Sequence, residues 1–329
     1  RIVRISTAGG RSASTPSPGG ASMPDPIDLE IAGRLVMGPA GAVVAGMIGG
    51  APYAAMVTQG LISMVDLSSP ETPKIVGQIN TIYGSAEKLF LSGEHLYAGY
   101  LEGRFQVFDV SSPASPKESG SAQLTGSVQG ISVQGEYAFV AAFTEGLRVL
   151  DVSDPASPQE VGSVPIPGQA FGVFVQGNYA YVAAGPAGLH VIDVSQPSGP
   201  REVGFGVAPT LTDGYYGVSV EGSYAFVASG RDGLRVIDIS NPEALNQVGF
   251  LGFFEGANSV LVQEGRAFIL DQHENLRVMD VSNPAAPKEV DLVDMKEAAK
   301  GVYVQDDLVL LTAGGAEGGL LVLRASGQP

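Results

Sequence analysis

The sequence predicts an all-β fold, a seven-bladed β-propeller of four-stranded antiparallel blades. Three observations lead to this prediction: a unit of 42 to 45 residues recurs along the chain, its strands carry apolar residues on both faces, and turn-forming residues are frequent. Glycine contributes 45 and proline 22 of the 329 residues, and only 16% of the residues are charged. This composition favours many short, buried strands that are separated by tight turns.

The pattern D-[VIL]-S-x-P marks the repeat most clearly. The third copy, Gln134–Ser163, reads QGEYAFVAAFTEGLRVLDVSDPASPQEVGS. A fixed period of this size is typical of arrays and rings in which each repeat is one supersecondary unit. The aspartates of the pattern are Asp66, Asp109, Asp151, Asp193, Asp238 and Asp280. They lie 43, 42, 42, 45 and 42 residues apart, and Arg324 occupies the equivalent position 44 residues after Asp280.

Each repeat contains four strand signals, here called A to D from the centre of the ring outward. In the third copy they cover Gly130–Gly135, Tyr137–Ala142, Leu147–Ser153 and Gln159–Val164. Short runs rich in Val, Tyr and Phe and bounded by Gly, Asp or Pro are typical of antiparallel meanders. The repeated aspartates are expected to be structural, because an Asp side chain at a turn accepts backbone N–H bonds two residues further on.

The A strands are apolar on both faces. In Gly172–Gly177, Val173 and Val175 point to one side and Phe174 points to the other. A strand buried on both faces lies in a sheet between two neighbouring sheets, as in a propeller. An open solenoid is the alternative, and it would need polar caps at its ends. The 303 residues from 27 to 329 divide into seven units of the observed length, so we predict seven blades.

The chain ends define the predicted domains. Residues 27–329 form one propeller domain, residues 7–26 a Gly/Ser/Thr/Pro-rich linker or exposed loop, and residues 1–6 a strand that resembles strand C. The last copy stops before its outermost strand. An N-terminal strand, either residues 1–6 or residues 27–36, is therefore expected to pair with the last blade and close the ring, which removes exposed sheet edges.

Leu35–Val57 carries no charged residue and is long enough to cross a bilayer. It is interrupted by glycines and by Pro39 and Pro52, and its second half aligns with the repeat. We therefore predict that it forms strands of the first repeat and that the chain has no membrane span.

The net charge of −16 argues against nucleic acid and anionic membranes as partners, because binding phosphate requires a basic surface. The absence of cysteine excludes disulfides, zinc–thiolate sites and a catalytic thiol. The first residue is Arg1, which we interpret as the result of processing or truncation.

The segments GLRVLDVSDPASP, GLHVIDVSQPSGP, GLRVIDISNP and NLRVMDVSNPAAP are each preceded by YAFVA or a variant of it. These segments resemble the LVIVD repeat family, and the resemblance covers roughly residues 35–326. It implies a propeller fold and, because many members are exported bacterial and archaeal proteins, an extracellular or cell-surface location, with the periplasm as the alternative. The resemblance implies no particular activity.

A meander places the D–A and B–C loops together on one face of the ring, here called the variable face, because only these loops differ from repeat to repeat. Variable loops on a rigid scaffold often carry function. The D–A loops are expected to bring Tyr83, Glu87, Gln129, Phe171, Tyr215, Tyr216, Asn258 and Lys300 toward the mouth of the central channel. The candidate binding residues of this face are Tyr100, Arg104, Phe143, Phe171, Tyr215, Tyr216, Arg231, Asp232 and His273.

Aromatic residues beside charged ones favour a non-enzymatic interaction or scaffold module that binds a protein or a glycan and needs no cofactor. His95, His190 and His273 lie in separate parts of the repeat, and no nucleophile-elbow pattern occurs. One alternative is a Ca²⁺-dependent, lactonase-like hydrolase with Glu87 and Asn258 as two of the six to eight oxygen ligands that Ca²⁺ takes. Another is a structural subunit of a larger surface assembly.

Overall fold

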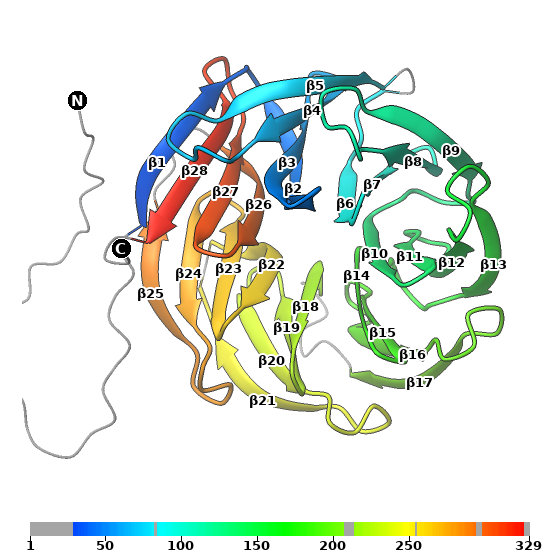
Figure 1. Ribbon diagram of the computed structural model, residues 1–329. Coiled ribbons are helices and arrows are strands. Elements are labelled where there is room, and N and C mark those ends of the chain that lie inside the picture. Colours follow the sequence, from blue (N-terminus) through cyan, green and yellow to red (C-terminus); the bar gives the residue numbers. More distant parts are fainter. Residues whose placement is uncertain (1–28, 82–83, 207–213, 254, 294–297, 326–329) are drawn as a thin grey trace, which may run out of the picture.

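The computed structural model describes residues 29–81, 84–206, 214–253, 255–293 and 298–325. Their 28 strands form seven four-stranded antiparallel sheets, which stand as blades around a common axis (Figure 1). The predicted seven-bladed propeller is thereby confirmed. The predicted strand at residues 1–6 and the predicted linker at residues 7–26 lie outside the described residues.

The strands of each blade follow one another from the centre outward, except in blade 7. Blade 1 contains β2 (Ala40–Ile48), β3 (Ala51–Thr58), β4 (Leu61–Asp66) and β5 (Lys74–Asn80). Blade 2 contains β6 (Lys88–Ser92), β7 (His95–Gly99), β8 (Arg104–Asp109) and β9 (Lys117–Gln123). Blade 3 contains β10 (Gly130–Gln134), β11 (Tyr137–Ala141), β12 (Leu147–Asp151) and β13 (Gln159–Val164).

The later blades repeat this order. Blade 4 contains β14 (Gly172–Gln176), β15 (Tyr179–Ala183), β16 (Leu189–Asp193) and β17 (Arg201–Gly206). Blade 5 contains β18 (Gly217–Glu221), β19 (Tyr224–Ala228), β20 (Leu234–Asp238) and β21 (Asn246–Leu251). Blade 6 contains β22 (Ala257–Gln263), β23 (Arg266–Asp271), β24 (Leu276–Asp280) and β25 (Lys288–Val293). Blade 7 contains β26 (Ala299–Gln305), β27 (Leu308–Ala313), β28 (Gly319–Ala325) and, as its outer strand, β1 (Leu29–Val36).

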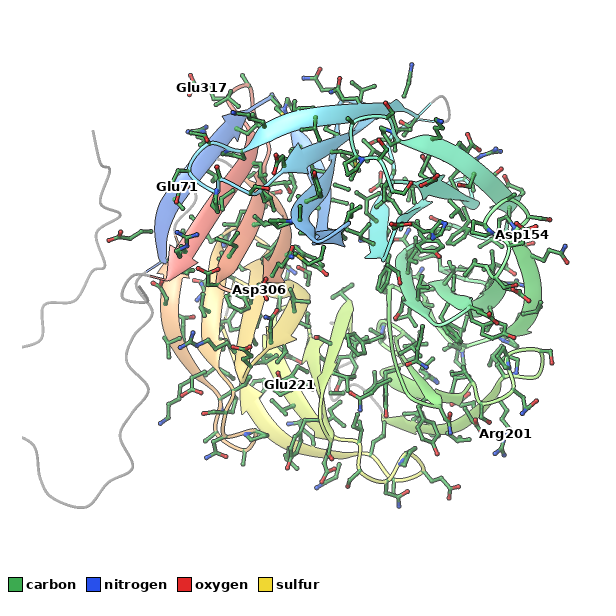
Figure 2. The ribbon with its side chains drawn as sticks, viewed as in Figure 1. Glu71, Asp154, Arg201, Glu221, Asp306 and Glu317 are labelled. Atoms are coloured by element: carbon green, nitrogen blue, oxygen red, sulfur yellow. The ribbon has the colours of Figure 1, made fainter. Side chains whose placement is uncertain are left out.

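Blade 7 joins the two ends of the chain. Strand β1 pairs antiparallel with β28, from Leu29 opposite Ala325 to Val36 opposite Gly319. Of the two predicted closing segments, residues 27–36 therefore supply the strand. Arg324 of blade 7 also lies 3.4 Å from Glu71, which belongs to the corner of blade 1 (Figure 2). The ring is thus closed both by a sheet pairing and by an inter-blade ion pair.

The hydrophobic core lies between the faces of adjacent blades. Val173 and Val175 of β14 pack with residues of blade 3, whereas Phe174 packs with residues of blade 5. The prediction that strand A is buried on both faces is therefore confirmed. Charged side chains such as Asp154 and Arg201 lie at the outer rim instead (Figure 2). Each interface between two blades consequently acts as a layer of the core.

The segment Leu35–Val57 contains β2 and most of β3, strands of the first repeat as predicted, whereas its first two residues, Leu35 and Val36, end β1 of blade 7. The described residues contain no helix of the length and hydrophobicity that a membrane crossing needs.

The aspartates of the repeat hold the turn between strands C and D. In each corner the carboxylate accepts the backbone N–H of the serine two residues further on, at 2.8 to 3.0 Å, as predicted from the sequence. Hydrogen bonds from the serine side chain and then from its backbone N–H lower the pKa of the carboxyl group below 3.8 in five corners, those of Asp66, Asp109, Asp151, Asp193 and Asp238.

In six of the seven outer strands, a glycine lets the corner of the next blade approach the strand's backbone. A Cβ at Gly204 would overlap with the carbonyl oxygen of Pro242, and a Cβ at Gly33 of β1 would overlap with that of Pro70. The same close approach occurs at the remaining positions of this kind: Gly77, Gly120, Gly162 and Gly249. These glycines are required by the lack of space and not by a left-handed backbone.

The substitution Gly204→Ala is expected to lower the free energy of unfolding by about 1–3 kcal/mol, because the added methyl group forces blades 4 and 5 apart. The matched control is Gly199→Ala, since Gly199 has a negative φ and no neighbour within 4 Å of its added Cβ. The midpoint of urea-induced unfolding, followed by circular dichroism, measures both variants. Equal midpoints for the two variants would contradict the close-approach argument.

The corner aspartates predict a specific loss of stability in acid. Because their pKa is lower in the folded chain than in the unfolded chain, their contribution is complete above about pH 4 and is lost as the pH falls through the folded pKa. A variant with Asn at positions 66, 109, 151, 193 and 238 still accepts the serine N–H but does not titrate. Its thermal midpoint is expected to fall less steeply than that of the wild type between about pH 4 and pH 2; equal slopes would count against this prediction.

Candidate functional site

The loops of the variable face are tied to one another across the blades. The B–C loop of one blade forms an isolated antiparallel bridge with the D–A segment that enters the next blade, and Phe143 thereby bridges Ala170. Two further bridges join Gly185 with Tyr215 and Gly230 with Ala257. Their N–H···O distances are 2.7 to 3.2 Å. The variable face in blades 3 to 6 is therefore a bonded surface rather than a set of independent loops.

Equivalent residues stand at the entrance to strand A in successive blades. Glu87, Gln129, Phe171 and Tyr216 each donate a backbone N–H to the last carbonyl oxygen of strand B in the same blade, at 2.8 to 2.9 Å. This shared hydrogen bond places the four residues at corresponding points around the ring, here called the channel mouth. Tyr83, which the sequence also assigned to this region, lies outside the described residues.

Three aromatic residues from blades 3, 4 and 5 form a continuous cluster at the channel mouth, here called the aromatic cluster. The rings of Phe143 and Phe171 meet edge to face with centroids 5.5 Å apart, and the rings of Phe171 and Tyr216 are 5.1 Å apart. All three residues are half-buried. Phe143 has a φ of 52°, an unfavourable conformation for a bulky residue.

Two of the predicted contact residues are buried, and the structure corrects their assignment. Tyr100 is 0% exposed and packs between blades 1 and 2, and Tyr215 is 2% exposed and packs between blades 4 and 5. Burial raises the pKa of both phenols. Their rings contribute to the core and cannot contact a partner on the surface of the folded protein.

The charged candidates divide into two groups. Arg104 donates to Ser121 at 2.9 Å, and Asp232 lies 3.0 Å from Arg235, so both are engaged within their own blades. Arg231 and His273 are exposed on B–C loops. With Phe143, Phe171 and Tyr216, these two residues are the predicted candidates that the structure leaves accessible on the variable face.

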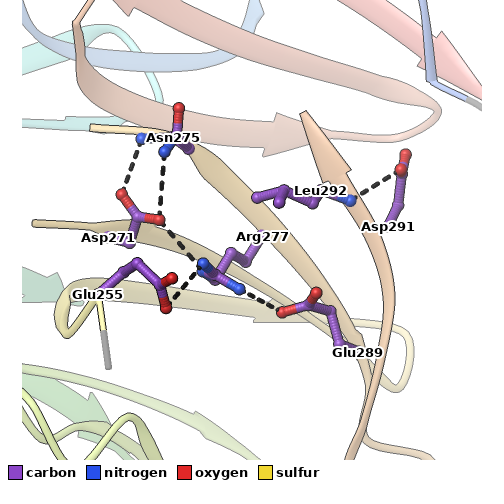
Figure 3. A network of polar contacts seen from close by, with 7 residues as sticks. All are labelled: Glu255, Asp271, Asn275, Arg277, Glu289, Asp291 and Leu292. Atoms are coloured by element: carbon purple, nitrogen blue, oxygen red, sulfur yellow. Dashed lines mark hydrogen bonds and ion pairs between the residues drawn. The ribbon is translucent and has the colours of Figure 1, made fainter. Parts of the chain in front are cut away.

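The sequence analysis did not predict the networks of ion pairs and hydrogen bonds that lie beneath the B–C loops of the variable face. Arg277 of β24 contacts Asp271 at 3.1 Å, Glu289 at 2.6 Å and Glu255 at 3.1 Å (Figure 3). Its guanidinium also lies 4.8 Å from the centre of the Phe253 ring. Burial works to lower the pKa of Arg277, but hydrogen bonds and charge from the three carboxylates raise it overall.

The same position carries Arg148 in blade 3 and Arg235 in blade 5, and each also bonds a residue twelve positions further on, Glu160 and Gln247. This constant spacing of twelve residues is the feature of the sequence that could have predicted the networks. Asp271, the last residue of β23, is 0% exposed although the loop that follows it is polar. These networks therefore hold the B–C loops in place through contacts with strands C and D of the same blade.

A cavity of 590 Å³ opens at the channel mouth, mainly between blades 7, 1 and 2, and is here called the mouth cavity. Its ionisable side chains are Glu87, Lys88 and Lys300. Lys300 forms an ion pair with Glu274. Within the described chain, Lys88 forms no ion pair. Desolvation by the surrounding protein lowers the pKa of Lys88, and the charge of Glu87 opposes this effect.

The two residues proposed as Ca²⁺ ligands do not form part of a larger ligand set. Glu87 lines the mouth cavity, and Asn258 is exposed one residue into β22. No group of three or more His, Cys, Asp or Glu residues in the described segments could hold a metal ion. A Ca²⁺ site at the channel mouth therefore stays a prediction that rests on two ligands.

Arg277→Met is expected to lower the free energy of unfolding by about 3–5 kcal/mol, because it leaves the buried carboxylate of Asp271 without its guanidinium. The double variant Arg277→Met/Asp271→Asn should recover part of this loss, since it removes the uncompensated charge. Arg231→Met is the matched control on the exposed loop of blade 5. Urea unfolding measures all three, and a midpoint for Arg277→Met equal to that of the control would refute the role of the network.

Comparisons with known structures support the fold alone, because the identities are low. A computationally designed protein, Ika8, aligns with a TM-score of 0.63 at 10% identity over 89% of this chain and 98% of that chain. The β-propeller domain of Cps50 (Swd1) from Myceliophteria thermophila aligns with a TM-score of 0.72 at 11% identity over 92% and 100%. U3-55K aligns with a TM-score of 0.70 at 9% identity over 90% and 98%.

A search of curated proteins finds no match to the sequence. The family model described as LVIVD repeat matches five successive segments, which together cover more than half of the chain: residues 83–123, 125–165, 167–205, 216–250 and 256–295. These segments coincide with blades 2 to 6, so one sequence repeat corresponds to one blade. The chain belongs to the LVIVD repeat family.

Proposed function

We propose that this propeller is a non-enzymatic interaction module that binds a partner protein through its variable face. The aromatic cluster of Phe143, Phe171 and Tyr216 is the observation that carries the proposal. It joins three blades at the channel mouth, whereas the opposite face repeats nearly the same turn in every blade. Clustered aromatic residues are the side chains that most often dominate the energy of protein interfaces.

The geometry of the aromatic cluster suits this role. Its rings contact one another, edge to face between Phe143 and Phe171 and tilted between Phe171 and Tyr216, and are half-buried, so little side-chain entropy is lost when a partner covers them. The bridge between Phe143 and Ala170 holds the loop that presents the first ring. Arg231 and His273, which are exposed on neighbouring B–C loops, provide polar contacts at the edge of the surface.

The proposal places the protein outside the cytoplasm, at the cell surface or in a larger surface assembly. The acidic composition and the absence of cysteine are compatible with this location. The proposal is motivated by the resemblance to the LVIVD repeat family, many members of which are exported. The acidic surface also favours a partner that is not itself strongly acidic.

The test begins with partners recovered by cross-linking on cells of the native source, and their affinity for the purified propeller is then measured by surface plasmon resonance. Phe171→Ala, which removes the central ring of the aromatic cluster, is expected to weaken binding by about 30-fold. Phe205→Ala is the matched control, because Phe205 is 60% exposed on the outer strand β17.

Unchanged affinity of every recovered partner for Phe171→Ala would show that the variable face is not the binding surface. A glycan array that is probed in parallel identifies a carbohydrate ligand. Binding there that depends on Phe171, with no protein recovered, would replace a protein partner by a glycan.

A further inference from the structure

Lys88 differs from the residues that occupy the equivalent register position in the inner strands of the other blades. It is the first residue of β6 and pairs with Gly99 of β7. In the same register, blades 3, 4 and 5 carry Gly130, Gly172 and Gly217, and blades 6 and 7 carry Ser259 and Gly301. Where most blades have no side chain or a short one, blade 2 thus places a long cationic side chain at the mouth cavity.

The ammonium group of Lys88 has no counter-ion in the described structure. The chain carries a net charge of −16, and the neighbouring Lys300 is paired with Glu274, yet no carboxylate of the described residues forms an ion pair with Lys88. Lys88 is exposed in the mouth cavity, so an anion that enters the cavity can reach its ammonium group. Desolvation by nearby protein groups lowers the pKa of Lys88. An anion that enters the mouth cavity would supply the missing acceptor.

The other walls of the mouth cavity limit which anion fits. Ala42 and Val302, which are half-buried, and the largely buried Val43 and Val57 form the apolar part of a wall that also carries polar groups. The cavity volume of 590 Å³ lies within the range of small-molecule sites. Glu87 lines the same cavity and disfavours a second negative charge on the ligand. A singly charged acid with an apolar body satisfies both conditions, whereas a phosphate monoester or a polyanion fails the charge condition.

We propose that the mouth cavity binds a small amphipathic monocarboxylate, whose carboxylate accepts a hydrogen bond from Nζ of Lys88 and whose apolar part packs against the valine-rich wall. The mouth cavity shares no residue with the aromatic cluster. This inference is therefore independent of the proposed protein partner.

Isothermal titration calorimetry with sodium octanoate tests the proposal on the whole chain. Octanoate is expected to bind at a ratio of one to one, and 1-octanol, which keeps the apolar part but lacks the charge, about ten-fold or more weaker. Lys88→Ser, which introduces the residue found in blade 6, is expected to weaken octanoate binding by about ten-fold or more. Lys74→Ser on the outer strand β5 is the matched control and should bind as the wild type does.

Lys88→Gln, which keeps most of the side-chain length without the charge, replaces Lys88→Ser if the shorter side chain impairs folding. Phe171→Ala should leave the affinity for octanoate unchanged, so the failure of one proposal is distinguishable from the failure of the other. The proposal is overturned if octanoate does not bind to the wild type at millimolar concentration, if 1-octanol binds equally well, if the Lys88 variants retain full affinity, or if inorganic phosphate competes more effectively than 1-octanol.

Discussion

The structure depends on the burial of each blade by its two neighbours. A four-stranded blade exposes two apolar faces, and neither face can be covered by the blade itself. Strand β14 shows how one strand contributes to two successive core layers. Val173 and Val175 lie on one of its faces, and Phe174 lies on the other. Because every blade needs a neighbour on both sides, the array is stable only as a ring, and the last interface must be built from the two ends of the chain.

The close contact between outer strands and corners follows from the same constraint. Blades pack tightly at the rim only where the outer strand carries a glycine beneath the corner of the next blade, and β1 conforms to this rule through Gly33 and Pro70. Blade 6 is the exception, since Asp291 occupies the glycine position in β25. Its neighbour is blade 7, in which β28 and β1 are not consecutive in sequence and no corner joins them. The glycine is therefore absent where the corner is absent.

Much of this architecture could be predicted because the same local sequence pattern recurs in each repeat. The period, the alternating apolar residues and the turn chemistry of Asp151 and its equivalents specify the blades, their number and their corners. The burial of Tyr100 and Tyr215 could not be predicted in this way, since a tyrosine in a variable loop has no periodic signal that shows which side of the loop it occupies. The ion network of Arg277 depends on Glu255, which lies outside the repeat pattern, so only part of it had a sequence signal.

A scaffold under such uniform constraint leaves few places where chemistry can vary, and the channel mouth is the clearest of them. The entrance to strand A has the same backbone hydrogen bond in blades 2 to 5, yet its side chain changes from Glu87 to Gln129, Phe171 and Tyr216. Because the backbone geometry is the same and the side chains differ, the channel mouth has two chemically different halves, here called arcs. Blades 3 to 5 present aromatic rings, and blades 7, 1 and 2 surround the mouth cavity, in which Lys88 has no ion-pair partner among the described residues. Each arc is held by the same inter-blade packing, so a substitution in one arc can change its chemistry without altering the shape of the other.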